Sequence, residues 1–525
     1  MGQSKPPVFL REATGLIREV GAWPSFMATV GLVTGGVPVL WVAIMYTAPG
    51  ASWPLAFLIA FIPTLAMAGL FTIIGVSMPR SGGDYVFTTR GLNPYVGFMN
   101  YWGVNIAYVL NVGIFGYYAT EYFGYVLSGF GAFYGNQALV NLGAWLTTTY
   151  PSVALGFVVL LIISSLAIIR PRYAWAWIFW SGVLSLICTV VMFAALANFN
   201  QASFAAAYNS FMGNSTAYNA VIQQGAVTSP PNGMVFATAA ALPFTWFAYT
   251  WYNLPASWSG EVKHVKRSMP IAILLAMAVI AVFYMALSWL VTSAFGQPFL
   301  ENWSSLAAAG TAPVPGIGGF IPFFALLVYK STPLYIVMFI ALWLPTFFSL
   351  LPLVISQTRY IFAMSFDRIL PEKVATVSDR FHTPLVATIL VTVGGMVGLS
   401  LMAILPNSGE FATATFAVFT FGFIIPAITG VIFPFRKKQI YEDTFVAKKK
   451  FILPLISWLG LGSALYLIYS TWLAHQSGSL PTDSFSLTLY GVIYGAGLLV
   501  LVVGYLRTRA KGLPLDLVFK EIPPE

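Results

Sequence analysis

The sequence contains few charged residues and almost no cysteine. Of its 525 residues only 8% are Asp, Glu, Lys or Arg, whereas soluble domains average about 25%. Apolar residues make up 58% and the mean hydropathy is +0.81, so the composition excludes a soluble enzyme and indicates an integral membrane protein. The single cysteine, Cys188, excludes an intramolecular disulfide and a thiolate metal site.

Histidine is also scarce. The three histidines, His264, His382 and His475, lie in loops or at the ends of apolar stretches, so we expect neither a metal site nor an enzyme built on histidine, and we predict no cofactor. The net charge of +9 comes from short basic clusters rather than a basic stripe with interleaved aromatic residues. Nucleic acid is therefore not an expected partner.

Apolar stretches of about 20 residues, the length that crosses ~30 Å of hydrocarbon, dominate the chain. We predict an all-α membrane protein with twelve spans, at residues 23–47, 53–78, 95–130, 151–169, 174–198, 234–257, 269–295, 333–364, 385–406, 412–434, 451–475 and 485–506. With this topology 24 of the 25 basic residues lie on one side, and only Lys330 lies on the other. Because cytoplasmic loops are enriched in Lys and Arg, both termini are predicted to be cytoplasmic in a multi-pass protein of the cell membrane.

The parts outside the spans are less regular. Residues 1–21 form a predicted cytoplasmic segment, in which apolar residues at helical spacing between 9 and 20 favour an amphipathic helix in the membrane interface over a solvated cap. The outer loops, 201–233 and 297–332, are long and rich in Gly, Ser, Asn and Pro. They carry glycosylation acceptor sequences at Asn214 and Asn302.

Two spans contain helix-breaking residues near their midpoints. Span one carries two glycines and a proline within Thr34 to Pro38, and span six carries Pro243 and Pro255 around a polar stretch. Irregular backbone at membrane depth is tolerated only where it is buried in protein or lines a cavity. We therefore predict a broken helix in each span, with a packing kink as the alternative.

The two breaks lie five spans apart, and since five is odd, a unit that starts at span six enters the membrane from the opposite side. This is typical of an inverted repeat, with repeat one at 22–198, repeat two at 199–434, spans eleven and twelve at 435–506, and a cytoplasmic tail at 507–525. Broken helices present amide groups to an anion and carbonyl groups to a cation. A zwitterion would satisfy both.

Three loop motifs reveal a family resemblance. Pro79-Arg80-Ser81-Gly82-Gly83-Asp84-Tyr85 resembles the P-x-SGG-x-Y signature of the amino acid-polyamine-organocation (APC) superfamily. The run from Glu261 to Pro270 is similar to that family's E-x-x-N-P-x-x-x-x-P, with His264-Val265 in place of Asn-Pro, and the segment from Arg359 through Asp367 to Thr383-Pro384 resembles the one after span eight. The matches cover roughly residues 11–434.

The resemblance implies a five-plus-five inverted-repeat (leucine-transporter-like) fold and secondary transport of amino acids or related amines by alternating access. In the family, amides of a G-S/A-G break in span one bind the substrate carboxylate. Thr34-Gly35-Gly36 stands at this break, followed by Val37, so Thr34 replaces the first glycine. In span six, Phe247-Ala248-Tyr249 fits the family's aromatic-small-aromatic run, while Thr250 and Trp251 stand where glycine is usual.

Further side chains are predicted to line the path. Trp251 either narrows the pocket in favour of small substrates such as glycine or alanine, or forms a gate, or is a packing aromatic. In span three, Asn105 and Tyr108 share a helical face, which favours cavity lining over hydrogen bonds between helices.

Candidates for ion coupling are few. Glu121 is almost the only ionisable residue within a span, and its calculated depth favours an interfacial carboxylate over a proton relay. Thr346 and Ser349 are the only reasonable hydroxyls for a sodium site. The region of span five that carries a lysine in some proton-coupled relatives has none here. Because the outer loops contain few carboxylates, proton coupling is favoured over sodium coupling.

Together these observations predict a permease, not an enzyme, that carries small neutral zwitterionic amino acids. Cationic substrates are not expected because no carboxylate lies at mid-depth in the spans. The alternatives are an amine or polyamine transporter or exchanger of the same fold and, from another class, an amino acid sensor (transceptor) or a channel-like protein. The expected partners are the substrate, a coupling proton or sodium ion and the lipid bilayer, for a monomer or homodimer.

Overall fold

The computed structural model describes residues 15–523 except 170, 229–232, 319, 406–407, 445, 448–452, 477–479, 513–514 and 521–522. The described residues are overwhelmingly helical and contain no β-strand, only an isolated bridge between Val20 and Val262. An all-α fold follows from apolar composition, because a helix satisfies its own backbone hydrogen bonds in lipid.

Nine helical segments in the described part of the chain are long and apolar enough to cross a membrane. They are Ala22–Ala43, Trp53–Ser77, Thr149–Ile168, Pro171–Ala197, Val265–Phe295, Thr332–Phe366, Leu385–Ile404, Ser408–Arg436 and Ser484–Ala510. The other three predicted spans coincide with helices that do not meet that criterion, namely α5 (Pro94–Tyr134), α11 (Gly233–Ala248) and α21 (Leu455–Gln476). The count of twelve spans and the inverted repeat therefore stay predictions.

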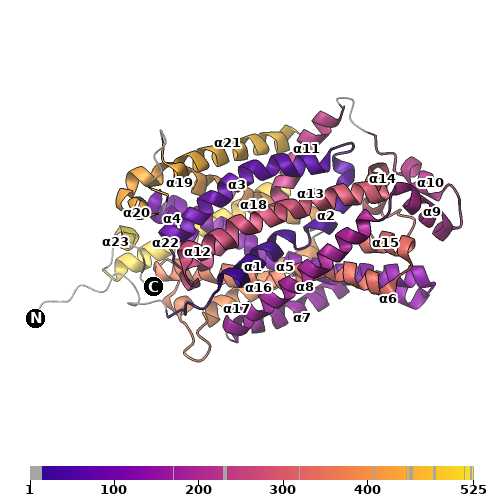
Figure 1. Ribbon diagram of the computed structural model, residues 1–525. Coiled ribbons are helices and arrows are strands. Elements are labelled where there is room, and N and C mark those ends of the chain that lie inside the picture. Colours follow the sequence, from indigo (N-terminus) through magenta and orange to yellow (C-terminus); the bar gives the residue numbers. More distant parts are fainter. Residues whose placement is uncertain are drawn as a thin grey trace, which may run out of the picture.

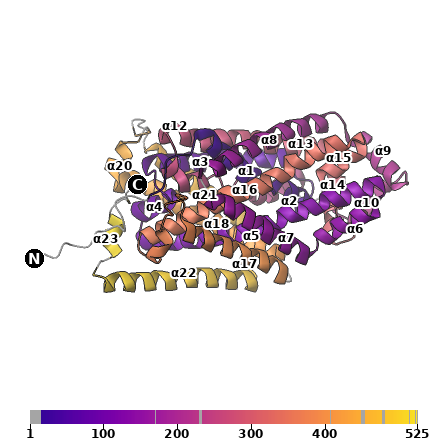
Figure 2. The same cartoon turned by 90° about the horizontal axis from the view of Figure 1, so that it is seen from below.

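The helices run side by side along one long axis (Figure 1). The longest two, α5 and α16 (Thr332–Phe366), pack against each other and against α17 (Leu385–Ile404). At the periphery, α21 packs on α19 (Ile424–Arg436) and α3 (Trp53–Ser77), and α22 (Ser484–Ala510) lies along one edge of the bundle (Figure 2).

Large apolar side chains cover much of the outside of the bundle. Trp180 is 67% exposed, Trp289 61% and Val492 64%. An exposed apolar surface this extensive is expected where lipid rather than water surrounds the protein. The outward faces and the nine apolar segments agree on a membrane-embedded fold.

Short helices lie at the two ends of the bundle (Figure 1). One end holds α4 (Gly83–Gly91), α12 (Val265–Pro270), α20 (Lys438–Glu442) and α23 (Leu515–Lys520). The other end holds α6 (Gln137–Leu146), α9 (Gln201–Met212), α10 (Ala217–Gly225), α14 (Gln297–Ala308) and α15 (Ile321–Tyr329).

The outer segments differ from the long loops that the sequence suggests, because four of these helices lie within them. Asn200 caps α9 by accepting a hydrogen bond from the Ser203 amide at 3.1 Å, and the Phe204 ring packs against Phe299 and Phe324. Some of the polar residues that suggested loops are helix caps. The aromatic residues between them pack together into a small core.

One smaller expectation is also corrected, and one of the two glycosylation acceptor sequences is buried. The described part of the N-terminal segment, residues 15–20, is not helical, since Gly15 has a φ of +78° and Val20 pairs with the backbone of Glu261 and Lys263. Residues 9–14 of that segment lie outside the described residues. Asn302 is 3% exposed and its amide bonds to the backbone at Val227 and Pro298, so it is not accessible for glycosylation, whereas Asn214 is exposed.

Candidate functional site

The break predicted in span one is present. Helix α1 (Ala22–Thr34) ends before Gly35, and α2 (Val37–Ala43) begins after Gly36 with Pro38 in its first turn. Gly36 has φ +74° and ψ −28°, a left-handed conformation that glycine adopts without steric cost. The segment that the sequence pattern marked as irregular is therefore a two-residue interruption between two half-helices.

This interruption leaves backbone donors open. The Gly35 amide donates to the Gly31 carbonyl at 2.8 Å, but the amides of Gly36 and Val37 have no hydrogen-bond partner among the described residues. Both residues are buried. Unpaired amides at the start of a helix attract negative charge, so this position can bind an anionic group. The Thr34 hydroxyl points elsewhere, because it donates to the Val30 carbonyl at 2.7 Å.

The break in span six follows α11, which ends at Ala248. Residues 249–253 form turns before a 3₁₀ helix, η2 (Leu254–Glu261). Trp251 has a φ of +70°, a conformation that non-glycine residues rarely adopt, at the position where the family usually carries glycine. Its side chain is 1% exposed, and its indole Nε1 has no hydrogen-bond partner among the residues that the structure describes.

The two breaks meet at an aromatic cluster. A Cβ atom placed on Gly36 would lie 3.5 Å from Cε1 of Phe115, and the Phe115 ring lies 5.4 Å from that of Trp251. Trp251 also packs against Phe247 at 5.3 Å and Phe419 at 5.6 Å. We call Phe115, Phe247, Trp251, Phe416 and Phe419 the aromatic cluster. It lies beside Gly36 of the first break and includes Trp251 of the second.

Some of the predicted substrate-binding residues face other parts of the protein. Asn105 donates to the Gln357 side chain on α16 at 2.9 Å, and Tyr249 donates to the Phe57 carbonyl at 3.2 Å. Ala248 is completely buried, and Thr250 donates to the Phe247 carbonyl at 2.6 Å. Asn105 thus joins two helices, which is the alternative that the sequence left open, and Tyr249 packs against α3.

Tyr108 stays close to the aromatic cluster. Its ring stacks on Phe419 at 4.7 Å, and its hydroxyl donates to the Asn253 side chain at 3.3 Å. Neither Phe115 nor Asn253 was singled out from the sequence. Phe115 is one of many aromatic residues in its span, and Asn253 is a single asparagine, so neither residue belongs to a recognisable pattern.

The candidates for ion coupling separate into two places. Thr346 and Ser349 lie beside the span-one break: Cβ atoms placed on Gly36 and Gly35 would lie 3.7 Å from Thr346 Cγ2 and 2.8 Å from Ser349 Oγ. The carboxylate of Glu121, on α5, accepts a hydrogen bond from Tyr125 at 2.8 Å and contacts none of the other predicted site residues through a hydrogen bond.

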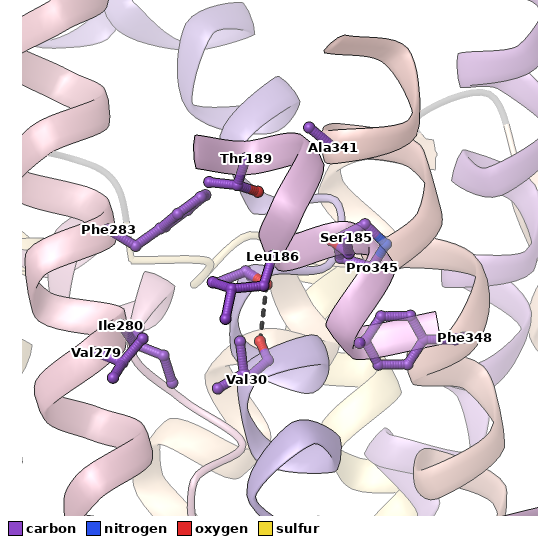
Figure 3. Close-up of a pocket in the computed structure, with 12 residues that line it drawn as sticks. Val30, Ser185, Leu186, Thr189, Val279, Ile280, Phe283, Ala341, Pro345 and Phe348 are labelled. Atoms are coloured by element: carbon purple, nitrogen blue, oxygen red, sulfur yellow. Dashed lines mark hydrogen bonds between the residues drawn. The ribbon is translucent and has the colours of Figure 1, made fainter. Parts of the chain in front are cut away.

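A small cavity adjoins the span-one break (Figure 3). Its volume is about 30 Å³, and residues of α1, α8 (Pro171–Ala197), α13 (Ala276–Phe295) and α16 line it, including the polar side chains of Thr34, Ser185 and Thr189. That volume holds no more than a few water molecules and is too small for an amino acid. The conformation described here is therefore closed around this side of the break.

The three loop motifs pack together at the end of the bundle that holds α4. Arg90 on α4 forms a bidentate ion pair with Asp367, with both distances 2.6 Å, and Arg359 pairs with Glu261 at 2.6 and 2.8 Å. All four side chains are at most 4% exposed. Buried pairs of this kind need both partners, which explains in physical terms why the motif residues occur together.

Asp84, from the first motif, is buried in the same region and was not predicted to have a role. Its Oδ2 accepts hydrogen bonds from the Tyr360 hydroxyl at 2.6 Å and from Asn253 at 3.4 Å. Asp84 lies on a connecting helix rather than in a span, so the expectation that no carboxylate lies at mid-depth in the spans does not concern it.

Comparison with known proteins decides the family. The profile described as "Amino acid permease" matches residues 20–498, most of the chain. This chain belongs to the amino acid permease family. The superfamily resemblance drawn from the three motifs is thereby confirmed, and the permease is a transporter rather than an enzyme.

The permease is similar to several characterised transporters. It is 22% identical to the methylthioribose transporter of Bacillus subtilis (strain 168), over 88% of this chain and 91% of the relative. It is 24% identical to the branched-chain amino acid permease BcaP of the same organism, over 87% and 93%. A human protein, cationic amino acid transporter 4, is 23% identical over 68% of this chain and 51% of its own length. The permease is thus a multi-pass membrane transporter of amino acids or related organic substrates.

Proposed function

We propose that the permease carries small neutral amino acids, bound as zwitterions at the two helix breaks. The observation that carries this proposal is the pair of amides at Gly36 and Val37 that have no partner among the described residues, at a break that lies beside Phe115 of the aromatic cluster. In this arrangement the substrate carboxylate accepts from these amides, and the ammonium group lies toward the carbonyl groups that follow α11. Relatives named for branched-chain and cationic amino acids support an amino acid substrate.

Trp251 limits the size of the substrate side chain. Its ring is enclosed by Phe115, Phe247 and Phe419, and its backbone already adopts an unfavourable conformation, so it has little freedom to move aside. Glycine and alanine are therefore the preferred substrates in this proposal. A neutral substrate fits because Arg90, Asp367, Arg359 and Glu261 of the motifs form ion pairs with one another and so offer no free charge to a substrate.

Transport in this proposal follows alternating access, in a protein of twelve spans with a five-plus-five inverted repeat. The permease lies in the cell membrane as a monomer or homodimer. Both of its termini are cytoplasmic. The distribution of basic residues supports this orientation. Helices at all twelve predicted positions and irregular backbone at both predicted breaks support the topology.

A proton drives uptake in this proposal. The scarcity of carboxylates in the outer loops favours proton coupling, since it suits a low external pH. The alternative is sodium bound near Thr346 and Ser349, whose positions beside the break are compatible with it. Uptake that requires sodium and ignores a pH gradient would select this alternative.

Uptake by the purified permease in proteoliposomes tests the proposal. Labelled glycine, alanine, leucine, lysine and putrescine are supplied with an imposed pH gradient, a sodium gradient or neither. We expect saturable, pH-driven accumulation of glycine and alanine. A protein that binds amino acids without accumulating them would be a sensor, and flux without saturation would indicate a channel.

A cationic substrate is the second candidate function. The observation that favours it is the buried Asp84 carboxylate, which forms no ion pair with a basic residue in the part of the chain that the structure describes. Lysine or putrescine uptake exceeding that of alanine in the same panel would establish this second candidate.

A further inference from the structure

Asp84 differs from every other buried carboxylate in the motif region. Glu261 and Asp367 each lie 2.6 Å from a guanidinium group, whereas Asp84 contacts only neutral donors among the described residues. It is 0% exposed, in the first turn of α4, the helix that connects the second and third predicted spans. A buried carboxylate without a cation is costly in its ionised form and readily accepts a proton.

The groups around Asp84 come from three of the elements that pack on α4, or from a residue next to one of them. Tyr360 lies on α16, whose Arg359 is paired with Glu261, a residue of η2. Tyr101 and Tyr108 lie on α5, and Asn253 directly precedes η2. The other titratable groups among the described side chains of α4, α19 and α23 point elsewhere. Tyr85 and Arg90 of α4 bond to Asp367, Arg436 of α19 bonds to the Leu92 carbonyl, and Lys520 of α23 is exposed, while α3 contains no titratable residue.

These surroundings set the protonation of the carboxylate. Burial raises the pKa of Asp84 to about 6, while hydrogen bonds from Tyr360, Tyr101 and Asn253 oppose part of that rise. Because the pKa is raised, the carboxyl group is protonated below about pH 6 and ionised above it. A group of this kind gains a proton from an acidic exterior and loses it to a neutral cytoplasm.

A short chain of contacts joins Asp84 to the span-six break. Asn253 donates to Asp84 and accepts from the Tyr108 hydroxyl, and Tyr108 stacks on Phe419, which packs on Trp251. When Oδ2 of Asp84 carries a proton, it becomes a donor, and the Tyr360 hydroxyl and the Asn253 amide can no longer both donate to it as they do now. The Asn253 side chain must then rearrange, and it belongs to the unwound segment itself.

We propose that Asp84 is the residue that binds the transported proton, and that Asn253 links its protonation to the conformation of the span-six break. The inference rests on the proposed function as an amino acid permease and identifies the coupling group within it. Glu121, Thr346 and Ser349 then have no part in proton binding. No covalent step is involved, since the carboxylate takes up a proton from one side of the membrane and releases it to the other.

The test separates coupling from substrate exchange. In proteoliposomes with internal pH 7.5 and external pH 5.5, labelled alanine uptake is measured for the wild type, for Asp84→Asn and for Asp379→Asn, a control at an exposed carboxylate. We expect Asp84→Asn to exchange internal for external alanine at a rate near that of the wild type but to lose accumulation driven by the pH gradient. Asp379→Asn should accumulate alanine like the wild type.

A second variant keeps Asp84 in place, so it remains informative if Asp84→Asn does not fold. Tyr360→Phe removes a hydroxyl that stabilises the ionised carboxylate, which should raise the pH of half-maximal uptake by about one unit. Three results would each overturn the inference. The first is an unchanged pH profile for Tyr360→Phe, the second is pH-driven accumulation by Asp84→Asn, and the third is loss of exchange by Asp84→Asn that is folded. If the wild-type protein moves no amino acid at all, the proposed function fails, and the inference fails with it.

Discussion

Trp251 shows how much a single residue determines at this site. A left-handed backbone conformation costs a non-glycine residue roughly 1–2 kcal/mol, and Trp251 adopts one at a φ of +70° while its ring is completely enclosed. Strain of this kind persists only where the surroundings enforce it. In the proposed site, this ring occupies the space that a substrate side chain would otherwise use.

Replacing Trp251 with glycine should therefore enlarge the site. The backbone strain is relieved, but loss of the buried ring costs ~3–5 kcal/mol, so the variant will be less stable. We expect the ratio of leucine to alanine uptake to rise by about tenfold, since each added methylene group is worth ~1–3 kcal/mol in a matching pocket. Trp289→Ala, at a position on the lipid-facing surface, is the control, and an unchanged ratio for Trp251→Gly would refute the size limit.

Gly36 is the second residue whose backbone defines the site. A Cβ atom there would meet Phe115, Tyr122 and Thr346 only at ordinary contact distances of 3.5 to 3.7 Å, but φ is +74°, which a β-branched residue strongly disfavours. We expect Gly36→Val to fold with the amides displaced and to lose uptake by roughly tenfold or more, because a hydrogen bond to a charged group is worth ~1.5–3 kcal/mol. Gly462→Val, where a Cβ atom meets nothing within 4 Å, should transport normally.

At the scale of elements, the short helix α4 contributes more than its length suggests. Its N-terminal Gly82 has a φ of +71° and donates to the Ser257 carbonyl at 2.7 Å, while a Cβ atom on Gly83 would lie 2.4 Å from the Ala256 carbonyl oxygen. The two glycines thus allow α4 to press against η2. This contact brings Asp84 and Arg90 into the interior.

The ion pairs that join these elements are also testable. Glu261→Gln leaves Arg359 buried without its carboxylate, which should destabilise the permease by ~3–5 kcal/mol. Thermal unfolding in detergent should show a clearly lower midpoint for this variant. The exposed pair of Lys438 and Glu442, 3.8 Å apart, offers a control, since Glu442→Gln should unfold at the wild-type temperature. Equal midpoints for both variants would contradict a structural role for the buried pair.

Elements with a strong local signal could be predicted from the sequence, and contacts between distant segments could not. Apolar length located the helices, and glycine and proline located both breaks, because these features act within a few residues. The partners of Asn105 and Tyr249 depend on how α5 and α11 are rotated against their neighbours. The burial of Asp84 was not predicted because it results from the packing of three motifs that are distant in the sequence. A local sequence pattern does not indicate such packing.

For the whole molecule, the sequence predicts an orientation that the helices alone do not specify. The basic clusters belong to the end that holds α4, α12 and α20, and the opposite end carries the helices of the outer segments (Figure 1). The positive-inside tendency places the basic end in the cytoplasm. This orientation also gives Asp84 a cytoplasmic side to which it releases a proton.

Cysteine labelling tests the orientation. The chain has one cysteine, Cys188, which is buried, so Cys188→Ser provides a background without thiols. Single cysteines are then introduced at Ser215 and Asp379, both exposed. A membrane-impermeant maleimide applied to intact cells should label only the cysteine at position 215. Once the membrane is permeabilised, it should label the cysteines at both positions. The reverse pattern would invert the topology.

Recognition of both charged ends of the substrate is the central claim, and competition by analogues tests it most directly. Uptake of labelled alanine into proteoliposomes is measured with excess unlabelled alanine, alaninamide, which lacks the carboxylate, or propionate, which lacks the ammonium group. The account predicts that only alanine competes, because the Gly36 and Val37 amides bind the carboxylate and the carbonyl groups of the span-six break bind the ammonium. Competition by alaninamide as strong as that by alanine would contradict it.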